Sequence, residues 1–98
     1  MFETLSLETV DEHVTIVWLN RPGASNALNT QMGRDLVRYF EDTALDPQSL
    51  RCIVLSGTGD KAFCAGGDLK ERRGMTDEAW TRQHVIFYTL SLHDALPI

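Results

Sequence analysis

The sequence lacks several features that would assign the chain to a specialised class of protein. No apolar run approaches the roughly 20 residues that a membrane-spanning helix needs. The 98 residues include nine Lys and Arg against 14 Asp and Glu, a net charge of −5. Because the basic residues form no strong cluster, nucleic acids and anionic membrane surfaces are unexpected partners. The acidic start, MFETLSLETVDE, differs from a signal or transit peptide, so we expect a cytoplasmic protein.

Cysteine is also scarce, since the chain has only Cys52 and Cys64. Both stand beside apolar residues, and we expect them to be reduced and buried rather than joined in a disulfide. Together with His84 they match no standard zinc spacing, so no metal site is expected. The length allows at most one domain, and a chain this short buries only a modest core.

Three segments have the composition of β-strands. Residues 2–10 alternate loosely, and Val14–Leu19 is rich in β-branched and apolar residues, so the two predict an antiparallel hairpin turning at residues 11–12. Residues 51–56, RCIVLS, predict a further strand that is buried on both faces.

Two longer helices are predicted around these strands. Asn29 or Thr30 can cap the first helix, and residues 46–47, Asp-Pro, end it. Its apolar face consists of Met32, Leu36, Val37, Phe40 and Ala44. Thr76 can cap a later helix whose first turn carries Asp77 and Glu78, where the helix dipole favours negative charge. The resulting order of strands and helices predicts an α/β fold.

Two adjacent glycines, Gly66 and Gly67, precede the helix-forming run at residues 68–72. The first turn of a helix has N–H groups without internal partners, which carry about half a positive charge. A residue without a side chain lets a ligand approach these groups closely. The pattern therefore suits an anionic oxygen, either on a phosphate or on a thioester carbonyl that becomes an enolate. A tight turn that binds nothing is the alternative interpretation.

A second glycine pattern competes with this one. Residues 57–62, GTGDKA, follow a predicted strand and match the dinucleotide-binding pattern G-x-G-x-x-G/A. That pattern needs a helix from its last position onward, and here such a helix would soon include Gly66 and Gly67, at about 1 kcal/mol each relative to alanine. We therefore disfavour a dinucleotide site.

The last ten residues, TLSLHDALPI, are unlike the rest of the chain. They are one reading frame of ACT CTT TCC CTA CAC GAC GCT CTT CCG ATC, a string that resembles a common sequencing-adapter oligonucleotide. An ordinary amphipathic segment is the alternative. We expect residues 89–98 to be a non-native, adapter-derived tail and residues 1–88 to be an incomplete N-terminal region.

Several motifs, in order and spacing, closely resemble the crotonase superfamily, also called the enoyl-CoA hydratase/isomerase family. They are LNRP at residues 19–22, NALN at 26–29, IVLSG at 53–57 and AFCAGGDLKE at 62–71. The resemblance covers residues 2–88. It implies the N-terminal part of a spiral of ββα units that binds an acyl-coenzyme A thioester, with no separate cofactor.

The resemblance also implies roles for individual residues. The N–H of Gly67 would be one of two donors to the thioester oxygen, which makes Gly67 the candidate catalytic residue. The expected substrate-binding residues are Ala24, Ser25, Ala27, Ala65, Gly66, Gly67, Asp68, Leu69 and Lys70. Asp68 is expected chiefly to start a helix, and Lys70 either contacts a coenzyme phosphate or is solvated. Glu71, with Arg72 and Arg73, is expected to form a solvated charged surface.

The function implied by the resemblance is that of an enoyl-CoA hydratase, a lyase of fatty-acid metabolism that forms homotrimers or homohexamers. In such hydratases the second oxyanion donor lies in a later glycine-rich stretch, and the acid and base glutamates lie there and beyond it. None of that stretch occurs before Tyr88, so the 98-residue chain itself is expected to be inactive. An isomerase, hydrolase or decarboxylase of the same superfamily is one alternative. A non-catalytic module that binds acyl-CoA or an adenine nucleotide is the other.

Overall fold

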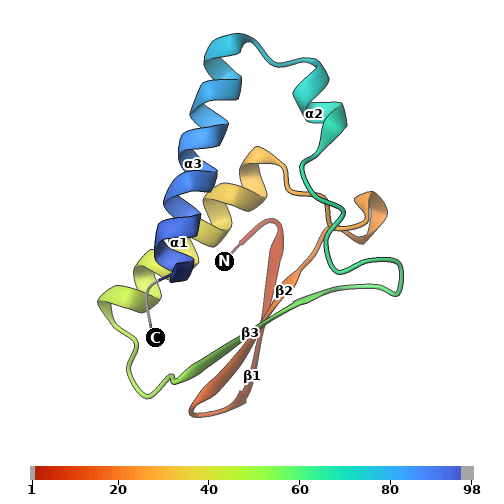
Figure 1. The fold of residues 1–98 in the computed structure, drawn as a ribbon. Coiled ribbons are helices and arrows are strands. Elements are labelled where there is room, and N and C mark those ends of the chain that lie inside the picture. Colours follow the sequence, from red (N-terminus) through yellow and green to blue (C-terminus); the bar gives the residue numbers. More distant parts are fainter. Residues whose placement is uncertain (1, 96–98) are drawn as a thin grey trace.

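The computed structural model describes residues 2–95, which form a mixed sheet with helices packed along one side (Figure 1). The elements are β1 (Leu5–Asp11), β2 (Val14–Leu19), a short 3₁₀ turn (Pro22–Ala24), α1 (Thr30–Leu45), β3 (Cys52–Gly57), α2 (Leu69–Arg73) and α3 (Asp77–Ala95). The α/β class and the order of elements agree with the prediction. Figure 1 shows α1 and α3 side by side, with the short α2 near the start of α3.

The strands pair in the order β1-β2-β3. The predicted hairpin is confirmed, since β1 and β2 are antiparallel and Leu5 lies opposite Leu19. β3 runs parallel to β2, which α1 makes possible by returning the chain to the same end of the sheet. β1 begins only at Leu5, because the backbone N–H and the hydroxyl of Thr4 instead donate to the buried carboxylate of Asp35, at 3.0 and 2.7 Å.

α1 supplies more than half of the hydrophobic core cluster. Its predicted cap is confirmed, because the Asn29 side chain accepts a hydrogen bond from the Met32 N–H at 2.9 Å. The helix ends at Leu45, as the Asp-Pro pair predicted. The core cluster consists of Leu5, Val17, Leu19, Met32, Leu36, Tyr39 and Phe40. Ala44, which the pattern placed on the same face, is exposed because it lies in the last turn, beyond the sheet.

β3 departs from the prediction of a strand buried on both faces. Val54 and Leu55 are 42% and 36% exposed, and Cys52 is exposed. Two features explain this: β3 lies at the edge of the sheet, where β2 is its pairing partner among residues 2–95, and the helices pack along one side of the sheet, which leaves the other face uncovered (Figure 1). Of its side chains, Ile53 packs against the core cluster.

α3 begins as predicted, with the Thr76 hydroxyl accepting a hydrogen bond from the Ala79 N–H at 3.1 Å. It packs against α1 at Gly33, where an added Cβ would lie 2.5 Å from the Phe87 ring. The helix continues through residue 95, into the segment predicted to be adapter-derived. Residues 96–98 lie outside the described residues, and the non-native origin of residues 89–98 stays a prediction.

The expectation of two reduced, buried cysteines is confirmed for the reduced state and wrong for the burial of Cys52, whereas Cys64 is partly buried and packs against the core cluster. Both thiols are free, but Cys52 is exposed on the edge strand β3 and Cys64 is partly exposed in the loop before α2. Among residues 2–95, no helix is long and apolar enough to cross a membrane.

Candidate functional site

The site is built from two loops that run parallel and pair through their backbones. Leu28, just before α1, and Gly67, just before α2, form an isolated parallel bridge. The Leu28 N–H donates to the Gly66 carbonyl at 2.7 Å, and the Asp68 N–H donates to the Leu28 carbonyl at 2.8 Å. Further along the same loops, the Ala65 N–H donates to the Ser25 carbonyl at 3.1 Å. These bonds fix the position of the Gly67 peptide on both sides.

Gly67 itself keeps its N–H free within this pairing. Among residues 2–95, no acceptor lies within hydrogen-bonding distance of this group, whereas both neighbouring positions pair with Leu28. Gly66 has φ of +90°, in the left-handed region that favours glycine, and it turns the chain so that the bridge can form. A fixed backbone donor without an internal acceptor is a group that can bind a ligand oxygen.

Asp68 starts α2, as the sequence predicted. Its Oδ1 accepts hydrogen bonds from the N–H groups of Lys70 and Glu71, at 3.0 and 3.2 Å. Its other oxygen, Oδ2, lies 3.0 Å from Nη2 of Arg21 in the loop after β2. The N–H of Glu71, and after it the guanidinium of Arg21, hold the pKa of the Asp68 carboxyl below its ordinary value of 3.8, against the opposing effect of burial.

Asn26 joins these loops to a third loop and is 1% exposed. Its Oδ1 accepts from the Arg21 N–H at 2.9 Å, and its Nδ2 donates to the carbonyls of Thr58 and Ala62 at 3.0 and 2.9 Å. Its φ of 55° is a conformation that asparagine tolerates better than most residues. In the sequence, Asn26 is notable only as part of the NALN motif, and no local pattern indicates this role.

Glu71 is partly buried and hydrogen-bonded, so the expectation that it forms solvated surface was wrong. Its Oε1 accepts from the N–H and hydroxyl of Thr30, at 2.8 and 3.0 Å, and from Nε2 of Gln83 at 2.7 Å. Thr30 is the first residue of α1, so Glu71 satisfies one of the N–H groups that a helix start leaves unpaired. Arg73 is exposed, as expected.

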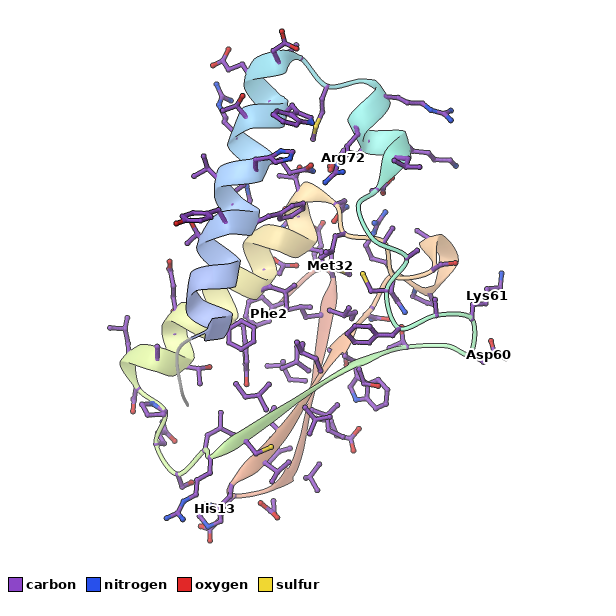
Figure 2. All side chains as sticks on the ribbon, viewed as in Figure 1. Phe2, His13, Met32, Asp60, Lys61 and Arg72 are labelled. Atoms are coloured by element: carbon purple, nitrogen blue, oxygen red, sulfur yellow. The ribbon has the colours of Figure 1, made fainter. Side chains whose placement is uncertain are left out.

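Arg72 also departs from the solvated surface that the sequence predicted. Its Nε donates to Oε1 of Gln83 at 3.1 Å, and Gln83 is 1% exposed. Figure 2 shows the Arg72 side chain directed from α2 toward α1 and α3. The sequence gives no sign that Gln83 is buried. A single glutamine on a helix without a clear apolar face is normally a surface residue.

The residues that the sequence assigned to substrate binding lie along the paired loops and α2. Ala24, Ala65, Gly66, Leu69 and Lys70 are exposed, Ser25, Gly67 and Asp68 are partly buried, and Ala27 is buried. A hollow of about 170 Å³ lies beside Ser25 and is lined by Pro22, Ser25, Asn26 and residues 58–62. The dinucleotide interpretation is not supported, because no helix follows residue 62 until Leu69.

Comparison with known proteins assigns the family. The family model for enoyl-CoA hydratase/isomerase matches residues 14–93 of the chain. This chain belongs to the enoyl-CoA hydratase/isomerase family. Its sequence is 40% identical to the Bacillus subtilis protein YngF, named as an enoyl-CoA hydratase/isomerase, over 99% of this chain and 37% of that protein.

Solved structures of family members agree with the fold. An enoyl-CoA hydratase from Bacillus anthracis matches with a TM-score of 0.86 at 31% identity, and one from Mycobacterium smegmatis with 0.84 at 36% identity. Each match covers 93% of this chain and 35% of the solved chain. The chain thus has the fold of the N-terminal region of these hydratases and spans about a third of their length.

Proposed function

We propose that this chain is the N-terminal part of an enzyme that acts on coenzyme A thioesters, with the Gly67 N–H as one donor of its oxyanion hole. The observation that carries the proposal is this N–H, which has no acceptor among residues 2–95 although hydrogen bonds to Leu28 hold its neighbours on both sides. A donor fixed before the ligand arrives needs no reorganisation when charge develops, which is how oxyanion holes lower barriers. Membership of the enoyl-CoA hydratase/isomerase family supports this assignment.

The proposed reaction is the addition of water to a 2-enoyl thioester. As the water oxygen bonds to C3, the water gives a proton to a base, the electrons of the C2–C3 double bond form a C1–C2 double bond, and the carbonyl π electrons move onto the thioester oxygen. The resulting enolate re-forms the carbonyl group when C2 takes up a proton from an acid. The Gly67 N–H would donate to the oxygen that gains negative charge. Asp68 and Glu71 already accept hydrogen bonds from Arg21 and Thr30, so they suit structural roles. We assign the acid and base to residues beyond this chain, which on its own should not hydrate crotonyl-CoA.

The exposed residues of the paired loops suit the coenzyme portion of the substrate. Ala24, Ser25 and Ala27 would contact it from one loop, and residues 65–70 from the other. Lys70 is exposed one turn from Gly67, where its ammonium group could meet a phosphate. The coenzyme thioester is substrate here, and no further cofactor is needed. By family resemblance we also propose a cytoplasmic homotrimer or homohexamer.

Replacement of Gly67 in the full-length protein tests the proposal. Gly67→Pro removes the N–H without breaking a hydrogen bond among residues 2–95, and we expect kcat with crotonyl-CoA to fall about 10²- to 10³-fold. Gly67→Ala keeps the N–H and is the matched control. Circular dichroism checks that both variants fold. Equal kcat values for folded Pro and Ala variants would contradict the role of Gly67.

A further inference from the structure

The guanidinium group of Arg72 lies directly against Gly67. A Cβ added to Gly67 would lie 2.6 Å from Cζ of Arg72, and 2.7 and 2.8 Å from its two Nη atoms. The guanidinium therefore occupies the space that a side chain at position 67 would fill. The N–H proposed to bind the thioester oxygen is attached to the same Cα. A cation and a candidate oxyanion donor thus lie on neighbouring sides of one residue.

A buried hydrogen-bond chain holds this cation in place. Nε of Arg72 donates to Oε1 of Gln83, and Nε2 of Gln83 donates to Glu71 and to the hydroxyl of Thr30 at 3.0 Å. Gln83 is 1% exposed, so each of its polar atoms depends on these partners. Because Nε is bound to Gln83, the two Nη atoms are the donors of Arg72 that remain for a ligand.

No carboxylate among residues 2–95 forms an ion pair with this fork. Asp68 is paired with Arg21, and Glu71 accepts from Thr30 and Gln83. Neither Nη atom of Arg72 has a hydrogen-bond acceptor within the described part of the chain. A partly buried arginine whose two outer nitrogens lack acceptors is suited to an anion that enters from outside.

We propose that Arg72 binds a carboxylate on the acyl chain, so that the preferred substrate is a 2-enoyl-CoA carrying a second acid group. This inference rests on the proposed function, because Gly67 places the thioester oxygen and thereby the start of the acyl chain. Two parallel N–H groups match the two oxygens of a carboxylate, whereas the single thioester oxygen can use only part of the fork. The phosphates of coenzyme A lie at the far end of the pantetheine arm, away from the acyl group.

The test compares two substrates of equal chain length in the full-length protein. One is a five-carbon 2-enoyl-CoA ending in a carboxylate, and the other is 2-pentenoyl-CoA. We expect wild type to favour the carboxylate substrate in kcat/KM. Arg72→Met keeps much of the length but removes the charge, and it should lower the ratio of the two kcat/KM values about 10- to 100-fold. Arg72→Lys should recover part of the ratio, since it keeps a charge without the planar fork.

Arg73→Met is the matched control, because Arg73 is the exposed neighbour on the same helix and should leave the ratio unchanged. An equal loss of kcat/KM for both substrates in Arg72→Met would overturn the inference, since the cation would then act on the thioester oxygen. A wild type that hydrates 2-pentenoyl-CoA without preferring the carboxylate would also overturn it, while the proposed function stands. Failure of wild type to bind either thioester in calorimetry would overturn both.

Discussion

The guanidinium of Arg21 lies 3.0 Å from the Asp68 carboxylate and joins the loop after β2 to the start of α2. Both partners have a second role, because Arg21 also donates to the Ala27 carbonyl at 2.6 Å and Asp68 also caps α2. The two side chains are only 23% and 13% exposed, so water screens them less than it does an ordinary surface pair. This pair ties together the two loops that carry the proposed substrate contacts.

The lowered pKa of Asp68, caused first by the hydrogen bond from the Glu71 N–H and then by Arg21, predicts acid sensitivity of the full-length protein. The pKa of Asp68 is lowered by folding, so its contribution to stability is fully present above its ordinary value of 3.8 and is lost as the pH falls through its lower folded value. Asp68→Asn should therefore flatten the dependence of the free energy of unfolding on pH between about pH 5 and pH 2. Urea unfolding measures this slope. Asp60→Asn, at an exposed position, is the control, and a slope unchanged by Asp68→Asn would contradict the prediction.

Asn26 is predicted to stabilise the three loops together. Asn26→Ala removes three hydrogen bonds and leaves an N–H and two carbonyl groups, all partly buried, without their partner. We expect the free energy of unfolding to fall by about 3 kcal/mol. Asn26→Gly should recover about 1 kcal/mol, because glycine adopts the positive φ of this position without strain.

Denaturant unfolding of the two variants separates the contribution of the hydrogen bonds of Asn26 from that of its positive φ. Asn20→Ala, at an exposed asparagine nearby, should cost about 0.5 kcal/mol or less. A loss at Asn26 no larger than the loss at Asn20 would show that the buried hydrogen bonds contribute little.

Glu71 is predicted to connect α2 to the start of α1. Glu71→Ala leaves the Thr30 N–H and Nε2 of the buried Gln83 short of an acceptor, so we expect a loss of about 2–3 kcal/mol in the free energy of unfolding. Glu71→Gln keeps an acceptor oxygen and should lose less than half as much. Glu78→Ala, at an exposed glutamate of α3, is the control. Thermal unfolding ranks the three variants by their loss of stability. An equal loss for Glu71→Ala and Glu71→Gln would contradict the assigned contacts.

Local sequence patterns predicted most of the fold correctly. Asn29, Thr76 and Asp68 each start a helix as expected, because capping depends on a side chain and the few residues that follow it. The hairpin of β1 and β2 likewise follows from strands that are adjacent in sequence. These features need no knowledge of distant contacts.

The errors arose where a residue's environment is set by distant parts of the chain. Cys52 and Leu55 have the composition of a central strand, but their exposure depends on β3 lying at the edge of the sheet. Glu71 lies in a highly charged run, and only folding brings it to Thr30 and Gln83. The candidate site was recognised through Gly66 and Gly67, whereas Asn26 and Arg21 hold the loops in place through contacts that spacing does not show.

The pairing of Leu28 with Gly67 has a consequence for how the protein can be modified. Leu28, in a different loop, fixes the position of Gly67. The length of the loop that connects β3 to Gly67 is therefore less important for this position. Figure 2 shows Asp60 and Lys61 at the outer tip of this connecting loop, and both are exposed. Additional residues inserted between them would extend outward into water while Thr58 and Ala62 keep their bonds to Asn26. This tip is therefore a place for an epitope or a fluorescent label.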